Sequence, residues 1–206
     1  PLLWTLRLPG GSVTRPAAMA LMDDGGAVVV GETDSQDGEL GDALGGRDAF
    51  ALRVDADGNI LWKRRFGGSL DDAFTQVLST PDGGVVALGM TTSTDGDARA
   101  SRGGMDAFLV RLNESGETLW IKCLGGTLDD ELLTITQGED GMLFVAGRTK
   151  SRNGDLRANF GGYDAWAALL LPEDGKPLWV VRYGQGGDDR FIQAMPTYEG
   201  WLLLGE

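Results

Sequence analysis

The acidic loops of this sequence carry residue types that could bind a metal cation. Asp95-Gly-Asp97 has counterparts at one constant interval before and after it, and each places two oxygen-bearing side chains around a glycine. Calcium prefers six to eight hard oxygen ligands gathered at a compact turn. The motifs therefore indicate a calcium site, whose candidate ligands are Asp37, Glu39, Asp95, Asp97, Asn153 and Asp155.

A second interpretation of these motifs needs no metal. Asp and Asn side chains often close Asx turns and accept hydrogen bonds from loop backbone groups. We favour this interpretation because the ligand spacing fits no complete EF-hand loop. A second acidic motif recurs at intervals of 58 and 59 residues and is expected on the same face of the fold: Asp71-Asp72, Asp129-Asp130 and Asp188-Asp189.

Few residues in this chain are suited to nucleophilic catalysis. There is no histidine, which excludes a Ser-His-Asp triad and the common histidine-containing zinc sites. The single cysteine, Cys123, stands where other copies of the repeat have arginine, and we expect an inert thiol because no histidine can activate it. Hydrolysis of a glycoside needs only two carboxylates, so an acid-based glycan-active enzyme stays open as an alternative.

The overall charge argues against nucleic acid and anionic membranes as binding partners. Lysine and arginine total 18 against 31 aspartate and glutamate residues, which gives a net charge of −13. Binding to nucleic acid or to an anionic membrane needs clustered cations, so neither partner is expected. The apolar runs are also shorter than the ~20 residues of a membrane-spanning helix.

The charge of one loop changes from copy to copy. Residues 32–47 carry a net charge of −4, residues 90–105 are neutral, and residues 148–163 carry +3. Drift of solvated loops is the simpler explanation. A head-to-tail contact between molecules is the alternative, since a basic loop could meet an acidic one. The candidate contact residues are Arg148, Lys150, Arg152, Arg157, Glu32, Asp34 and Asp42.

A repeat of about 58 residues organises the whole chain. The 33 glycines include Gly31, Gly89, Gly147 and Gly205, which follow one another at this constant interval. The chain holds about 3.6 repeats of this length. We expect one β-propeller domain over residues 1–206, with repeats at roughly 12–68, 69–126 and 127–184 and partial blades at 1–11 and 185–206. Because its ends fall within repeats, we expect part of a longer propeller or completion by a second chain.

Each repeat reads as four short strands, which we name A to D in chain order. In the second repeat these are residues 74–80, 85–89, 107–112 and 117–124, separated by tight turns and one long loop. Four antiparallel strands in 40–60 residues are typical of a propeller blade. The fold class is therefore all-β, with strand A innermost and Trp62, Trp120 and Trp179 buried between blades.

The antiparallel order also predicts two different faces. The B–C and D–A loops share one face, which we call the long-loop face, and the A–B and C–D turns share the other, the short-turn face. Any ligand site is expected on the long-loop face, because long loops carry function more often than tight turns.

The repeat resembles a known family. The string from Asp106 to Asn113, then Leu119-Trp120, Leu124-Gly-Gly126 and Asp129-Asp130, is similar to the bacterial seven-bladed β-propeller repeat family. The resemblance implies a secreted or cell-surface location and no particular reaction. The expected function is a non-catalytic extracellular module that binds a protein or glycan, or acts as a scaffold, within a larger bacterial protein. No cofactor other than calcium is expected.

Overall fold

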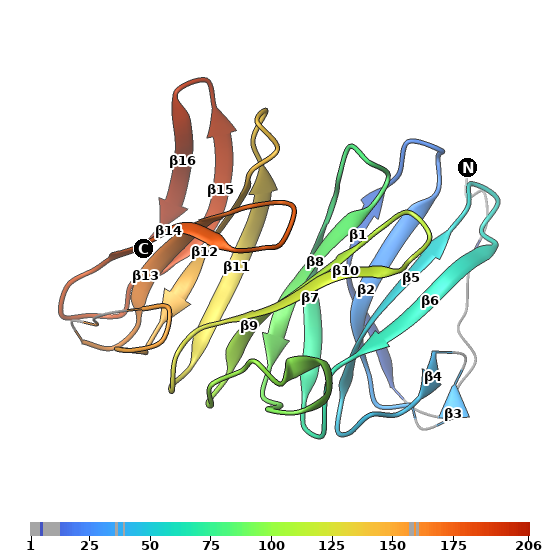
Figure 1. Cartoon of the computed structure of the whole chain (residues 1–206), viewed down its shortest axis with the longest axis horizontal. Helices are drawn as coiled ribbons and strands as arrows, with labels where there is room; N and C mark the ends of the chain where they lie inside the picture. The colour runs from blue at the N-terminus through green and yellow to red at the C-terminus, as the bar shows by residue number, and fades with distance from the viewer. Residues whose placement is uncertain (1–4, 6–12, 36, 39, 157–158, 160) are drawn as a thin grey trace.

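Three four-stranded antiparallel sheets and one hairpin follow one another as propeller blades (Figure 1). The computed structural model describes residues 5, 13–35, 37–38, 40–156, 159 and 161–206. The first blade contains β1 (Thr14–Leu21), β2 (Ala27–Thr33), β5 (Asp48–Val54) and β6 (Ile60–Phe66). The second contains β7 (Asp72–Ser79), β8 (Val85–Thr91), β9 (Asp106–Leu112) and β10 (Thr118–Leu124). The third contains β11 (Asp130–Gln137), β12 (Leu143–Thr149), β13 (Asp164–Leu170) and β14 (Pro177–Tyr183).

A partial fourth blade consists of β15 (Phe191–Thr197) and β16 (Gly200–Gly205), which supply the expected A and B strands. Strands pair in chain order within every blade. The A strands β1, β7, β11 and β15 contact one another from blade to blade, so strand A is innermost as predicted. The all-β fold and its sequence repeat are therefore confirmed.

The repeated glycine of each B strand faces a bulge in strand A. The pairing of β7 with β8 shifts register between Phe74 and Gln76, next to the pair Phe74–Gly89. A Cβ atom on Gly89 would lie 1.8 Å from the carbonyl oxygen of Ala73. No side chain fits there, which explains a glycine at every equivalent position.

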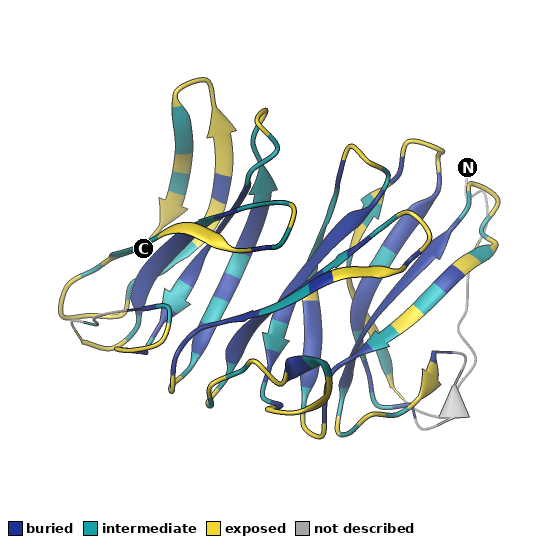
Figure 2. Ribbon diagram, in the orientation of Figure 1, coloured by how far each residue is buried: buried dark blue, intermediate teal, exposed yellow. Residues whose placement is uncertain are grey.

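Most of the hydrophobic core lies between blades, and one smaller cluster lies within the first blade. One cluster joins the first two blades through residues such as Val30 and Phe74, and another joins the second and third through Leu88 and Val145. In the three complete blades the B and C strands are buried almost throughout, whereas the D strands are partly exposed (Figure 2). Burying strands on both faces matches their continuous apolar sequence.

Two loop details were not expected from the sequence. The first B–C loop contains a small hairpin of β3 (Asp37–Gly38) and β4 (Gly41–Asp42), and the second contains a 3-10 turn at Gly96–Ala98. The D strand expected at residues 3–8, apart from residue 5, and Trp4 lie outside the described residues. No helix in the described part of the chain is long and apolar enough to cross a membrane.

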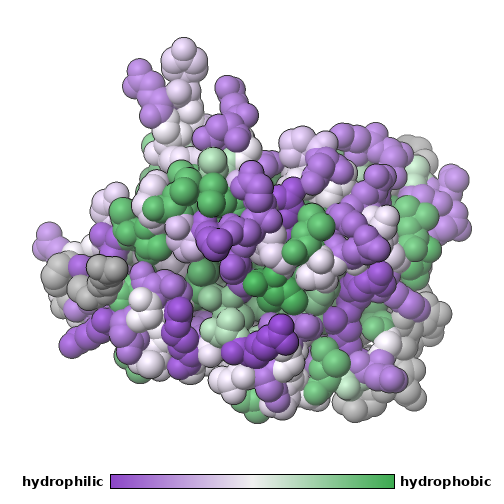
Figure 3. Space-filling model, in the orientation of Figure 1, coloured by the Kyte–Doolittle hydropathy of each residue, from purple (hydrophilic) through white to green (hydrophobic). Residues whose placement is uncertain are grey.

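The prediction for the three tryptophans was right for two of them. Trp62 and Trp120 are 9% and 8% exposed, but Trp179 is 37% exposed. The first two are covered by the C–D turn of the following blade, and the described residues contain no such turn beside Trp179. Hydrophobic side chains are exposed over the third and fourth blades (Figure 3); they include Leu178, Ile192, Met195, Leu202 and Leu204.

Candidate functional site

The Asp-Gly-Asp motif of the second blade caps the loop that enters that blade. The Asp95 carboxylate accepts a hydrogen bond from the backbone N–H of Ser69 at 2.7 Å, and this bond is the main cause of the lowered pKa of Asp95. Asp97 accepts one from the N–H of Gly67 at 3.3 Å. The B–C and D–A loops therefore meet on one face, as predicted, and their side chains satisfy backbone groups.

The third blade repeats this arrangement with one addition. Asn153 accepts a hydrogen bond from the N–H of Thr127 at 3.0 Å, and Asp155 accepts one from Gly125 at 3.1 Å. Arg102 of the second blade reaches Asp155 with an N–O distance of 2.5 Å. This ion pair links the long loops of two neighbouring blades.

The first blade differs in its candidate ligands. Asp37 lies in β3, its side chain is not described, and Glu39 lies outside the described residues. Among the described residues, no three carboxylate or cysteine side chains gather as in a metal centre. Calcium binding stays a prediction, while the capping role of the other four ligand candidates is visible in the hydrogen bonds.

The first aspartate of each Asp-Asp motif clamps two blades together. Asp71 accepts hydrogen bonds from the backbone N–H of Arg47 and from its guanidinium, both at 2.9 Å. In return, the carbonyl of Arg47 accepts a hydrogen bond from the N–H of Asp72 at 2.7 Å. Asp188 makes the same side-chain contact with the N–H of Tyr163, and Asp129 with that of Met105.

The glycine pairs before each C strand make room for this clamp. A Cβ atom on Gly46 would lie 2.5 Å from the Asp71 carboxylate, and one on Gly162 would lie 2.0 Å from that of Asp188. Close approach of the next blade therefore requires glycine here, and in the second blade Gly104 also has a positive φ of 66°.

The second aspartate of the motif is buried in the first two copies, at Asp72 and Asp130. Asp72 accepts hydrogen bonds from the N–H of Gly68 and the hydroxyl of Ser93. Burial raises its pKa, and the nearby Asp48 adds to the shift. Asp130 is held by the equivalent Gly126 N–H and Ser151 hydroxyl. These carboxyls lie inside blade joints, so they serve the fold.

Cys123 changes the charge balance of one joint. Arg65 pairs with the buried Asp48 at 3.0 Å, and Arg182 pairs with Asp164 at 2.8 Å. In the second blade Cys123 replaces this arginine; burial raises the pKa of Asp106, as it raises that of Asp48 beside its arginine. Burial also raises the pKa of the Cys123 thiol to about 12, as expected for an unreactive cysteine.

The charged loop residues of the third blade have partners within that blade. Arg148 donates two hydrogen bonds of 2.8 Å to Glu131, and Lys150 lies 3.5 Å from Asp129. Both cations also lie over the ring of Tyr163, at 4.2 and 4.3 Å from its centre. Arg152 is exposed, and Arg157 lies outside the described residues.

In the first blade the charges are reversed: the acidic loop residue Glu32 has basic partners. Glu32 binds Arg15 at 2.8 Å and Arg47 at 3.1 Å. Asp34 accepts a hydrogen bond from the backbone N–H of Val13, and Asp42 is exposed in β4. Arg15 and Glu32 face each other across β1 and β2, and the same position holds Glu131 and Arg148 in the third blade. The reversal of loop charge is thus partly balanced inside each blade.

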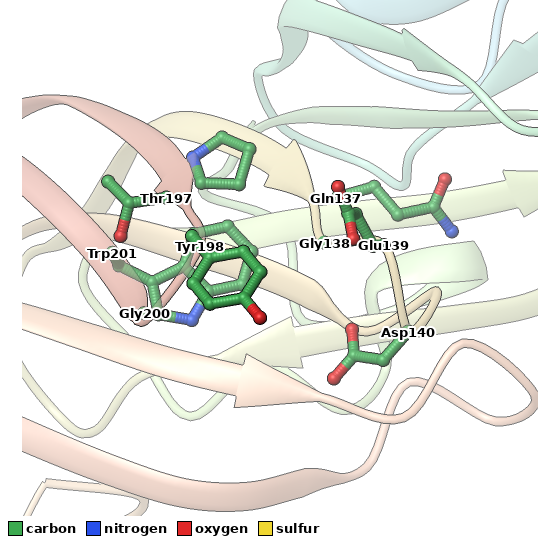
Figure 4. A pocket seen from close by; sticks show the side chains of 9 residues that line it. Gln137, Gly138, Glu139, Asp140, Thr197, Tyr198, Gly200 and Trp201 are labelled. Atoms are coloured by element: carbon green, nitrogen blue, oxygen red, sulfur yellow. The ribbon is translucent and has the colours of Figure 1, made fainter.

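A cavity of about 630 Å³ lies on the short-turn face, where sequence reasoning expected no site (Figure 4). It is formed by the A–B turns of the third and fourth blades. Its lining includes two carboxylates and two aromatic rings, and consists of Gln137, Gly138, Glu139, Asp140, Pro196, Thr197, Tyr198, Gly200 and Trp201. The signal that could have found it is the departure of Tyr198 and Trp201 from the repeat.

Comparisons with known proteins assign no family to this chain. No protein-family model matches the chain. The regulatory protein FlaEY of Caulobacter vibrioides is 26% identical over 184 residues, which cover 82% of this chain. The match spans 19% of FlaEY, so this chain corresponds to less than a fifth of that protein.

Proposed function

We propose that this chain is a non-catalytic extracellular module, built from blades of the bacterial seven-bladed β-propeller repeat family, that binds a partner or acts as a scaffold in a larger protein. The observation that carries the proposal is the use of the repeated polar residues. Asp71, Asp95 and their counterparts hold neighbouring blades together through backbone hydrogen bonds. Groups engaged in this way stabilise the fold and are not free for acid–base chemistry.

The open side of the fourth blade supports a scaffolding role. The indole of Trp179 is exposed at a position where Trp62 and Trp120 are covered by the next blade. Strand β16 pairs only with β15 among the described strands. An unpaired strand edge accepts further strands, so this side fits a C–D hairpin of the same repeat. The greater length of FlaEY is compatible with a module inside a larger protein.

Blade completion can be tested by extending the repeat. Glu206 corresponds to Arg148, so a second copy of residues 149–183 placed after Glu206 continues the pattern in register. We expect a higher melting temperature and protection of Trp179 from a soluble fluorescence quencher. The control carries the same 149–183 composition in scrambled order. Equal melting temperatures for the two extensions would contradict the scaffolding role.

The absence of catalysis is tested separately. The purified chain is applied to a glycan array and then incubated with oligosaccharides, and released reducing ends are measured. Binding without turnover is the expected result for the module. Hydrolysis that rises in proportion to protein concentration would favour the alternative, a glycan-active enzyme that uses two carboxylates.

Protease treatment of intact cells that carry the tagged full-length protein tests the surface location.

A further inference from the structure

We propose that the cavity between the A–B turns of the third and fourth blades binds a guanidinium or ammonium group of a ligand. The inference rests on the proposed binding role and names the chemistry of the group that is bound. It is carried by a comparison of the same position in three blades, where an acidic turn residue has kept its place but lost its arginine.

In the first two blades an arginine of strand C neutralises an aspartate of the A–B turn. Arg53 binds Asp24 at 2.8 Å, and Arg111 binds Asp82 at 2.7 Å. The equivalent aspartate of the third blade is Asp140, but Leu169 stands in place of the arginine. The third blade therefore keeps the acceptor of this ion pair without its donor.

The replaced arginine is one of several changes that gather at this place. Gly138 stands where the first two blades have the buried Met22 and Thr80. Trp201 stands where every earlier B strand has a smaller apolar residue, and its ring stacks on Phe144 with a centroid distance of 4.5 Å. A Cβ atom on Gly138 would lie 2.7 Å from the Asp140 carboxylate and in ordinary contact, at 3.4 Å, with the Trp201 ring, so the missing side chain spares this carboxylate a close contact.

The walls of the cavity suit an organic cation. The rings of Tyr198 and Trp201 lie on one side and the Asp140 carboxylate on the other (Figure 4). One carboxylate oxygen of Asp140 accepts a hydrogen bond from the N–H of Met142 at 3.1 Å. Within the described part of the chain, no ion pair involves Asp140 or Glu139, and the cavity lining contains no lysine or arginine. Aromatic faces and carboxylates together attract guanidinium and ammonium groups.

Two further properties agree with a cationic ligand. The net charge of −13 raises the local concentration of cations near the surface. Tyr198 is fully exposed at the tip of the β15–β16 hairpin, where it can close over a bound group without displacing core residues. A sugar could also stack on these rings, but a sugar would not take the place of the lost arginine.

The test compares two probes that differ mainly in charge. Capped arginine (Nα-acetylarginine methylamide) and its neutral citrulline analogue are titrated into the full chain, and binding is followed by tryptophan fluorescence and calorimetry. We expect the arginine probe to bind on the order of tenfold more tightly than the citrulline probe. Added salt should weaken the arginine probe selectively, because exposed charges are screened.

Variants locate the binding to this cavity. Leu169→Arg restores the internal arginine and should abolish binding of the probe without removing a cavity residue. Asp140→Asn and Trp201→Leu should each weaken binding about tenfold. Asp57→Asn, an exposed carboxylate in a turn of the first blade, is the matched control and should bind normally. Circular dichroism and melting temperature confirm that each variant is folded.

The outcomes are decisive in both directions. Equal affinity for the two probes, no binding of either, or full binding by folded Leu169→Arg would overturn the inference. Failure of both agmatine and a capped Gly-Arg-Gly peptide to displace the arginine probe would also overturn it. Tighter binding of the peptide than of agmatine indicates a partner protein, and the reverse indicates a free guanidinium compound. A chain that hydrolyses glycans yet binds the arginine probe would contradict only the non-catalytic role.

Discussion

The indole N–H of Trp120 donates a 2.9 Å hydrogen bond to the backbone carbonyl of Pro172 and so ties the outer strand of the second blade to the C–D turn of the third. Trp62 makes the same bond to Glu114 in the joint before it. In each joint the arginine of strand C donates to the same carbonyl. The outer edge of each blade is therefore fastened to a turn of the next blade, far along the chain.

Removal of a covered tryptophan should be costly. Trp120→Ala is expected to lower the free energy of unfolding by about 3–5 kcal/mol, because a large buried side chain leaves a cavity. Trp179→Ala should cost about 1–2 kcal/mol, since its ring is already partly exposed. Urea denaturation of both variants measures the difference. Similar losses would contradict the role assigned to the following blade.

The glycine of the C–D turn is the other half of this joint. Gly116 has a φ of 75°, and a Cβ atom there would lie 2.6 Å from the Trp62 ring. Gly116→Ala should therefore cost about 1–2 kcal/mol for the left-handed backbone plus about 1–3 kcal/mol for overpacking.

Gly41 provides the control for this substitution. It has a φ of 93° and no atom within 4 Å of an added Cβ, so Gly41→Ala should show the backbone cost alone. Thermal and urea unfolding of the two variants separate the terms. A smaller loss for Gly116→Ala than for Gly41→Ala would argue against the tight contact with Trp62.

The Cys123 thiol should be protected in the native protein. Because burial raises its pKa to about 12, almost no thiolate is present near neutral pH. Alkylation at about pH 8 should be slower by on the order of a hundredfold or more in buffer than in denaturant. Mass spectrometry follows the modification over time. Rapid labelling of the folded chain would show that the joint opens readily.

The carboxyl of Asp106 should make stability depend on pH. Burial raises its pKa above the ordinary value of 3.8, so the folded state holds this proton more tightly than the unfolded state. Its contribution to the free energy of unfolding is therefore present at low pH and is lost as pH rises through the raised pKa. Asp106→Asn should flatten this fall when urea denaturation is compared at about pH 4 and about pH 7. An unchanged slope would contradict the prediction.

The acidic long loops allow metal and capping roles to be separated. Asp95→Asn keeps an oxygen acceptor for the N–H of Ser69, whereas Asp95→Ala removes it, so only the alanine variant should lower the melting temperature clearly. If calcium binds, millimolar calcium should raise the melting temperature above that in chelator, by mass action. Asp95→Asn combined with Asp97→Asn should abolish the response. Equal melting temperatures in calcium and chelator would leave capping as the role of these residues.

Local pattern was sufficient to predict the strands. The run Val85–Gly89 lies within β8, and residues 107–112 lie within β9, because continuous apolar residues between turn signals define short buried strands. The two faces of the blades also follow from alternating strand direction. The hairpin of β3 and β4 was not predicted, since two-residue strands carry no periodic signal.

The site was less accessible to such reasoning. Repeated aspartates drew attention to the long-loop face, where the structure engages them in backbone hydrogen bonds between blades. The cavity near Asp140 is lined by Trp201, and Leu169 stands in strand C where the first two blades have arginine; both are ordinary apolar residues when read singly. Their meaning emerges only when equivalent positions of different blades are compared in space.

The sequence by itself determined the repeat, the strand order and the position of each turn, because these depend on residues that are near neighbours along the chain. Only the tertiary structure decided which tryptophans are buried and which aspartates are neutralised. Burial of a tryptophan depends on a contact with the next blade, which lies about one repeat further along the chain. Trp179 occupies the same place in its repeat as Trp120, and it differs because burial is a property of the neighbour that covers a side chain.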